Sequence, residues 1–132
     1  LLYVKHTDGN IMPFEKEFFA DMGIDAFHSI DPEAGMDIGL LKKKYGDKIT
    51  LWGNVDCGRT LILGSPEDVI RETKQVMKVA SPGGGHVLSS SNTVTSDTPT
   101  ENFLAMVETV KEFGKYPIDI DVDLEEKKLL LP

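Results

Sequence analysis

Two pairs of polar residues follow apolar runs that read as strands, and each pair could take part in chemistry. His6 and Asp8 come directly after LLYVK, and Asn54 and Asp56 come after KITLWG. Residues two apart on a strand point to the same side, so the members of each pair would face the same way. An imidazole beside a carboxylate can orient a polar substrate or ligate a metal ion. The alternative for both pairs is structural, since such residues also end strands and cap turns.

Four further polar residues are candidates of less specific kinds. Asn92 follows the run GHVLSSS and would lie just beyond its strand. Cys57, the single cysteine of the chain, could be a soft ligand, although an isolated cysteine more often packs as a small apolar side chain. His28, within AFHSI, faces either the pocket or the core. His86 begins a strand at the end away from the other candidates, and we expect it to be structural.

A strand followed by an amphipathic helix repeats four times, and these elements must position the polar residues. The expected strands are 2–7, 26–30, 49–54 and 86–91. The expected helices are 14–23, 36–46, 66–80 and 98–114. The third helix should have Ser65 as its N-cap and Pro66 at its first position. The fourth should begin with a capping box formed by Thr98 and Glu101.

The side chains expected to be buried are apolar and recur at the helical spacing. In the first helix they are Phe14, Phe18, Phe19 and Met22; in the third, Val69, Thr73, Val76 and Ala80; in the fourth, Phe103, Met106, Val107 and Val110.

Strands that are apolar on both faces and alternate with helices belong to a parallel sheet covered by helices, so the fold class is α/β. Residues 1–116 hold all four units and form one domain. A closed barrel of eight units needs about 250 residues. Four units therefore make either half a barrel or a small open sheet. The tail, residues 117–132, alternates apolar and acidic residues and either forms an edge strand or lies loose.

Composition excludes several classes of protein. The 132 residues are 40% hydrophobic and 27% charged, as is usual for one soluble domain, and no apolar run is long enough for a membrane span. A formal net charge of −8 argues against nucleic-acid binding, which normally requires a basic face. A single cysteine and the lack of a signal-peptide pattern predict a cytoplasmic protein without a disulfide.

Four stretches resemble the C-terminal half of the uroporphyrinogen decarboxylase superfamily: HTDGNI, YGDKITLWGNVD, GSPEDVIRETKQVM and TPTENFLAMVETVKEFGKYP. This superfamily includes cobalamin-dependent methyltransferases that act on methylated corrinoid proteins. The likeness is strongest at GNVD and at the helix start that follows it. It implies a (β/α)8 TIM barrel with its site at the C-terminal ends of the strands, to which this chain would contribute strands five to eight.

In the methyltransferase branch, the resemblance places His6 on the histidine of a zinc-binding His-x-Cys pair. Asp8 stands where that cysteine would be, and Asn92 lies near the position of a second cysteine. A thiolate zinc site like that of the branch is therefore not encoded. A carboxylate also ligates zinc, so His6 and Asp8 could still be two metal ligands. They could instead orient a substrate at the rim, or simply end a strand as a hydrogen-bonded pair.

The decarboxylase branch uses no cofactor, and the resemblance makes different demands there. Decarboxylases of this branch have cationic groups that bind the substrate carboxylates, and a histidine in a Gly-His-Gly segment. This chain has Asn92 at about the position of that histidine. The arginine-rich loop belongs to the family's N-terminal half. The chain alone is therefore not expected to catalyse decarboxylation.

Three functions follow as expectations. The first is methyl transfer with a corrinoid cofactor or corrinoid protein, which the His6–Asp8 pair and the GKYP segment favour. The second is decarboxylation of uroporphyrinogen in porphyrin biosynthesis, and the third is a non-catalytic fragment or assembly subunit. A tetrapyrrole or corrinoid ligand is the expected partner.

We also expect a homo-oligomer, because half a barrel exposes its interior and two strand edges. The interior candidates are Val4, Phe27, Leu51 and Leu88.

Overall fold

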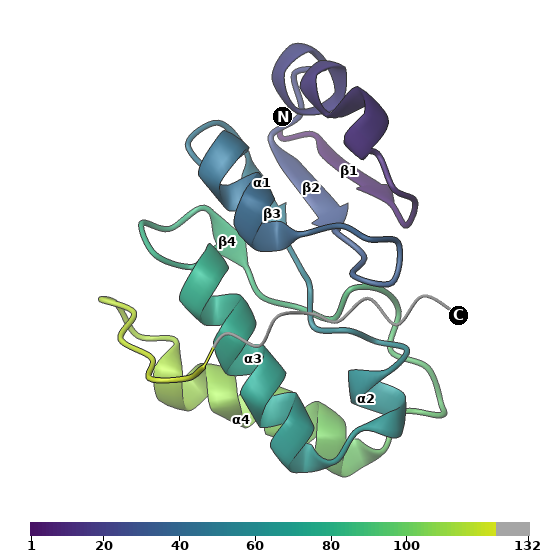
Figure 1. Cartoon of the computed structure of the whole chain (residues 1–132), viewed down its shortest axis with the longest axis vertical. Helices are drawn as coiled ribbons and strands as arrows, with labels where there is room; N and C mark the ends of the chain where they lie inside the picture. The colour runs from purple at the N-terminus through teal and green to yellow at the C-terminus, as the bar shows by residue number, and fades with distance from the viewer. Residues whose placement is uncertain (124–132) are drawn as a thin grey trace.

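The computed structural model describes residues 1–123, and its four strands form one parallel sheet (Figure 1). The strands are β1 (Val4–Thr7), β2 (Ala26–Ser29), β3 (Thr50–Trp52) and β4 (His86–Val87). They pair in the order β1-β2-β3-β4, and all pairings are parallel. This confirms the predicted parallel α/β sheet and its sequential order. The fourth strand is shorter than predicted and continues only as an isolated bridge between Val55 and Ser90.

The helices are α1 (Ile38–Tyr45), α2 (Thr60–Leu63), α3 (Pro66–Ala80) and α4 (Thr100–Phe113). The helix predicted over 14–23 is confirmed in part, as an irregular helical segment over residues 12–21. This segment begins as a 3₁₀ turn, η1 (Met12–Phe14), and ends as a π-helical turn, η2 (Glu17–Asp21). Phe18 and Phe19 are buried as predicted, whereas Phe14 and Met22 are 49% and 48% exposed, because the irregular helix does not keep the four on one face.

The two long helices begin differently. Ser65 caps α3 as predicted, since its Oγ accepts from the amide of Asp68 at 3.2 Å and Asp68 Oδ2 accepts from the Ser65 amide at 2.9 Å. The capping box predicted for Thr98 is absent from α4, which begins after Pro99. The N-cap position is instead taken by Pro99, which makes no side-chain capping hydrogen bond. Thr98 therefore lies one residue too early to cap the helix.

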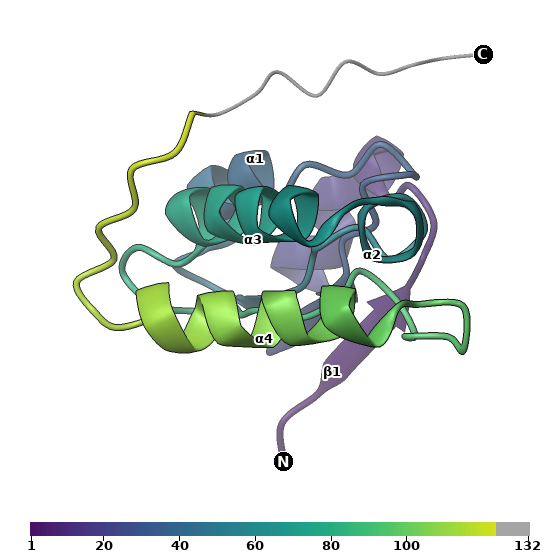
Figure 2. The same cartoon turned by 90° about the horizontal axis from the view of Figure 1, so that it is seen from below.

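Two apolar clusters hold the helices to the sheet. The larger lies between β2, β3, η2 and α1, and the smaller joins the segment after β3 to α2, α3 and α4. Buried members of the larger cluster include Phe18, Phe19, Phe27, Leu41, Tyr45 and Leu51. Those of the smaller cluster are Val55, Leu61, Val69, Val76 and Met106. Figure 2 shows α3 and α4 lying along one another, and their contact closes the smaller cluster.

The sheet has one face packed on helices and one face without them in the described part of the chain. Phe27 and Leu51 pack on the helix side, so their predicted place in a barrel interior is wrong. The other face carries a row set by the strand register: His6 is paired with His28, His28 with Trp52, and Trp52 with Val87. Trp52 and Val87 are 36% and 42% exposed. We call this row the open sheet face.

The beginning of the tail lies against α3 and not against the sheet. Gln75 Nε2 donates to the Asp123 carbonyl at 2.8 Å and Lys78 Nζ to the Val122 carbonyl at 2.7 Å, while Ile120 is buried. Residues 117–123 form no strand. The rest of the predicted edge strand, 124–132, lies outside the described residues. Within the described part, no helix has the length and apolarity needed to cross a membrane.

Candidate functional site

The predicted pair His6 and Asp8 lies at the C-terminal end of β1, at the edge of the open sheet face. His6 Nε2 is 3.0 Å from Asp8 Oδ1. Ser29, at the end of β2, donates from Oγ to the same carboxylate oxygen at 3.1 Å and also contacts the Thr7 carbonyl at 3.2 Å. The ends of β1 and β2 are thus joined through one carboxylate. The His6 and Asp8 side chains remain about half exposed, 48% and 50%, and are accessible to a ligand.

His28 extends this pair into a hydrogen-bonded chain. Its Nδ1 lies 2.7 Å from His6 Nδ1, and its Nε2 lies 3.4 Å from the carbonyl oxygen of Ser90, beyond β4. The His6 and His28 ring centroids are 4.8 Å apart, and Trp52 packs on the other side of His28 at 5.6 Å. The sequence left the orientation of His28 open; the structure places it on the open face, in contact with the predicted site.

The surroundings of His28 favour its neutral form. Burial lowers the pKa of His28, the hydrogen bond to the Ser90 carbonyl opposes this, and the nearby His6 lowers the pKa further, while Asp8 raises it. Two adjacent imidazoles cannot both be charged without mutual repulsion. The more buried ring of the pair is therefore the neutral one.

Asn54 follows β3 as predicted, but it points into the protein. The residue is 1% exposed, and its Nδ2 donates to the Ile30 carbonyl at 2.8 Å. Ile30 has a positive φ of 57°, which a β-branched residue seldom adopts, and its side chain is fully buried. Asn54 thus fixes the turn that follows β2. This hydrogen bond holds the Asn54 side chain away from the His6–Asp8 pair.

Asp56 caps the turn that leads into α2. Its Oδ1 accepts from the amides of Gly58 and Arg59, both at 2.9 Å, and its own amide donates to Glu72 Oε1 at 3.1 Å. This is the turn-capping alternative that the sequence left open. Next to it, the Cys57 amide donates to Ser91 Oγ at 3.2 Å, and the side chain packs on the smaller apolar cluster.

Asn92 lies two residues beyond Ser90, in the loop after β4. Its Oδ1 accepts from the Thr93 amide at 2.7 Å, and its carbonyl oxygen accepts from Ser90 Oγ at 2.6 Å. It therefore shapes the loop that presents the Ser90 carbonyl to His28. His86 is structural, as predicted, since it connects Ser81 Oγ at 2.8 Å and the Gly53 carbonyl at 2.7 Å.

The described residues do not form a metal site by themselves. Both ring nitrogens of His6 have polar neighbours, Asp8 at Nε2 and His28 at Nδ1. Over residues 1–123, no group of three His, Cys, Asp or Glu side chains is placed to hold a metal ion. A zinc ion at His6 and Asp8 would need further ligands from outside these residues.

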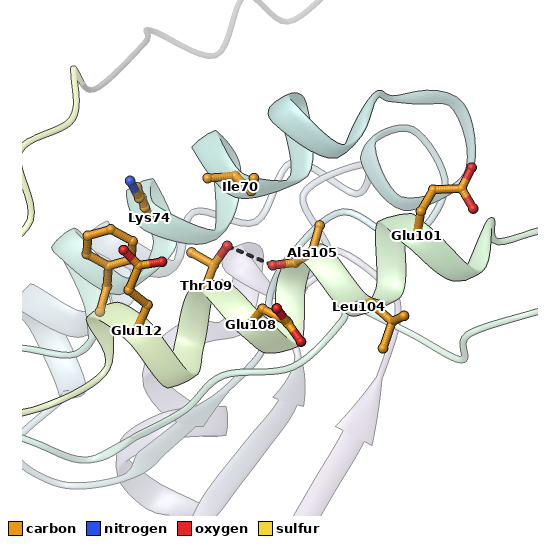
Figure 3. A pocket seen from close by; sticks show the side chains of 9 residues that line it. Ile70, Lys74, Glu101, Leu104, Ala105, Glu108, Thr109 and Glu112 are labelled. Carbon is orange, nitrogen blue, oxygen red and sulfur yellow. Dashed lines mark hydrogen bonds between the residues drawn. The ribbon is translucent and has the colours of Figure 1, made fainter.

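A groove of about 610 Å³ lies elsewhere, between α3 and α4 (Figure 3). Three carboxylates, Glu101, Glu108 and Glu112, stand along it, and Lys74 lies 3.8 Å from the centre of the Phe113 ring. None of the predicted site residues lines this groove, which belongs to the helix layer.

Comparisons with known proteins agree with the resemblance seen in the sequence. The family profile named uroporphyrinogen decarboxylase (URO-D) matches residues 2–113. A uroporphyrinogen decarboxylase from Dechloromonas aromatica is 35% identical over 121 residues, which is 84% of this chain and 33% of that protein. The enzyme of the same name from Coxiella burnetii is 32% identical over 98 residues, 74% of this chain and 26% of that one.

A likeness to a solved structure supports the barrel architecture of this chain. The methyltransferase from Methanosarcina mazei superposes with a TM-score of 0.71 and 28% identity, covering 86% of this chain and 32% of that one. The chain thus spans about a quarter to a third of the proteins it matches. Its four parallel βα units are part of a TIM-type barrel. The chain belongs to the uroporphyrinogen decarboxylase (URO-D) family, within the superfamily that also holds this methyltransferase.

Proposed function

We propose that this chain forms one wall of a barrel site that binds a methylated corrinoid and serves methyl transfer. The observation that carries the proposal is the hydrogen-bonded set of Asp8, His6 and His28 at the C-terminal strand ends, where barrel enzymes have their sites. The likeness to a methyltransferase structure supports it.

The open sheet face suits a large ring with polar substituents. Trp52 is 36% exposed and presents an apolar surface, while His6 and Asp8 stand at the edge with half-exposed polar atoms. A corrin ring has an apolar plane and amide groups around its periphery. Contact of the ring with Trp52 and of the amides with the polar edge would hold it across the strand ends.

Methyl transfer makes simple demands on the protein. A bound methylcorrinoid would supply a methyl group to a nucleophilic acceptor. An acceptor such as a thiol would have to release its proton as it takes that group. His6, held by Asp8, is the accessible group that can orient the acceptor and exchange that proton.

Decarboxylation of a porphyrinogen is the second candidate, because the curated relatives are named uroporphyrinogen decarboxylases. That reaction needs cations for the substrate carboxylates. Arg59, beside the predicted site, already pairs with Glu33 at 3.3 Å. Asn92 stands where the resemblance places a histidine in this branch and near a cysteine position in the other, so it does not separate the two reactions. The pairing of Arg59 makes the methyl-transfer proposal the better fit.

A binding experiment separates the two candidates without requiring turnover by the chain. Absorbance titrations would measure the affinity for methylcobalamin and for uroporphyrin, the stable oxidised relative of the decarboxylase substrate. We expect methylcobalamin to bind more tightly, and His6→Ala to weaken it about tenfold, or about 1.4 kcal/mol. Lys111→Ala, on α4 and exposed, is the matched control and should change nothing. Tighter binding of uroporphyrin would favour the decarboxylase.

A further inference from the structure

We propose that His28 is a positioning residue whose Nδ1 hydrogen bond fixes the ring of His6, and that Asp8, His6, His28 and the Ser90 carbonyl act as one relay. The inference rests on the proposed function for the use of His6, but the hydrogen-bond arrangement can be tested independently.

Donor and acceptor types limit where the protons of this relay can lie. The Ser90 carbonyl only accepts, so His28 Nε2 carries a proton when it bonds to it. The contact between the two Nδ1 atoms needs a proton on one of them and none on the other. Asp8, as a carboxylate, accepts from His6 Nε2 whenever that nitrogen carries a proton.

The surroundings of His28 assign the acceptor role to its Nδ1. Burial lowers the pKa of His28, which favours a ring with a single proton, and Nε2 faces the Ser90 carbonyl, which can only accept. The Nδ1 of His28 is then left to accept from His6 Nδ1 at 2.7 Å.

The relay restrains His6 from both sides. Asp8 is tied to Ser29 at the end of β2, and the Ser90 carbonyl belongs to the loop that follows β4. Trp52 packs against the His28 ring from β3. Side chains or backbone from all four strand ends thus determine where the His6 ring points. Removing His28 frees one side of that ring, while the carboxylate still holds the other.

Two substitutions separate hydrogen bonding from packing. His28→Phe keeps a ring of similar size but has no nitrogen, and His28→Asn places an amide near the former Nδ1. The first readout is the ¹⁵N chemical shift of each histidine ring nitrogen, which reports whether that nitrogen bears a proton. It is observed by long-range correlation with the protons bound to the ring carbons. In the original chain we expect one Nδ1 of the His6–His28 pair to bear a proton and the other to bear none, as their hydrogen bond requires.

In His28→Phe we expect the Nδ1 resonance of His6 to shift, because its hydrogen bond to His28 is lost. In His28→Asn we expect this resonance to return most of the way to its original position. The His86 ring, bonded to Ser81 and Gly53, reports on the fold and should not change. The second readout is methylcobalamin affinity, which should fall about fivefold in His28→Phe and recover in His28→Asn. Unaltered His6 resonances in His28→Phe would overturn the positioning role. Altered resonances without any methylcobalamin binding by the original chain would keep that role and reject the proposed function.

Discussion

Asn102, in the first turn of α4, donates from Nδ2 to the carbonyl oxygen of Gly64 at 2.8 Å. The same nitrogen lies 3.1 Å from the Leu61 carbonyl, so one amide group satisfies two acceptors at the end of α2. Asn102 is 1% exposed. A polar side chain therefore occupies a position on α4 that faces the core.

Asn102→Ala should lower the free energy of unfolding by about 2–3 kcal/mol, because one buried and one partly buried carbonyl oxygen lose their donor. Leu104→Ala, two residues away and 50% exposed, is the control and should cost below about 1 kcal/mol. Urea denaturation of both variants measures the difference. A larger loss for Leu104→Ala would mean that α4 is rotated relative to the described structure.

This helix shows where sequence reasoning about the fold fails. Apolar spacing predicted a buried stripe that includes Phe103 and Met106, but only Met106 is buried, and Phe103 is 38% exposed. The buried face instead includes Asn102 and Thr109, whose polar groups bond to backbone carbonyls. Hydrophobic periodicity does not register a polar residue whose partner lies on another element. On α3 every predicted core residue is apolar or Thr73, and the prediction is confirmed.

The positions of the strand ends could be predicted from the sequence. Which side chains of each strand point toward the helices could not. His6 and Asp8 are together at the end of β1, as the two-residue spacing indicated. Phe27 and His28 are neighbours in a strand that is buried on both faces, so the sequence does not tell which of them faces the helices. The strand register resolves this, because it aligns His28 with His6. The role of turn residues such as Asp56 could not be predicted either, because the residue types that cap turns also take part in catalysis.

Acid should destabilise the chain partly through His86. Burial lowers the pKa of His86, Lys42 lowers it further, and the hydrogen bond to the Gly53 carbonyl acts in the opposite direction. The unfolded chain therefore binds more protons than the folded one as the pH falls below about 6.5, the pKa of free histidine. Stability is retained above that pH and falls from there down to the lowered pKa of the folded state.

Urea denaturation at pH 7.5 and pH 5.5 measures this effect in the original chain and in His86→Gln. The variant should be less stable at pH 7.5 and should lose less stability between the two pH values. An equal loss in both proteins would show that carboxylates, not His86, cause the acid dependence.

Zinc is tested by elemental analysis of protein purified without a chelator or an affinity tag. The described residues offer at most two clustered ligands, so we expect far less than one zinc per chain. Near-stoichiometric zinc that disappears in His6→Ala would contradict this and would reinstate the zinc site that the resemblance suggested.

The two unpaired edges of the sheet predict that the chain associates with a second copy of itself. In residues 1–123, β1 and β4 each pair on one side only, and Val4, Trp52 and Val87 on the open face are 44%, 36% and 42% exposed. A second copy could pair its β1 with β4, which would leave neither edge unpaired and keep the C-terminal strand ends accessible. We predict a dimer of the 14.6 kDa chain at micromolar concentration, measured by light scattering after size exclusion. A stable monomer would contradict it.

The central claim is that the C-terminal strand ends, and not the helix layer, form the ligand-binding face. Backbone amide spectra recorded during a methylcobalamin titration test it most directly. We predict shifts that saturate together at residues 6–9, 28–30 and 90–93, with little change along the α3–α4 groove at Glu108 and Glu112 or at the opposite strand ends near Gly84. Shifts concentrated at the groove or near Gly84, with none around His6, would contradict the account.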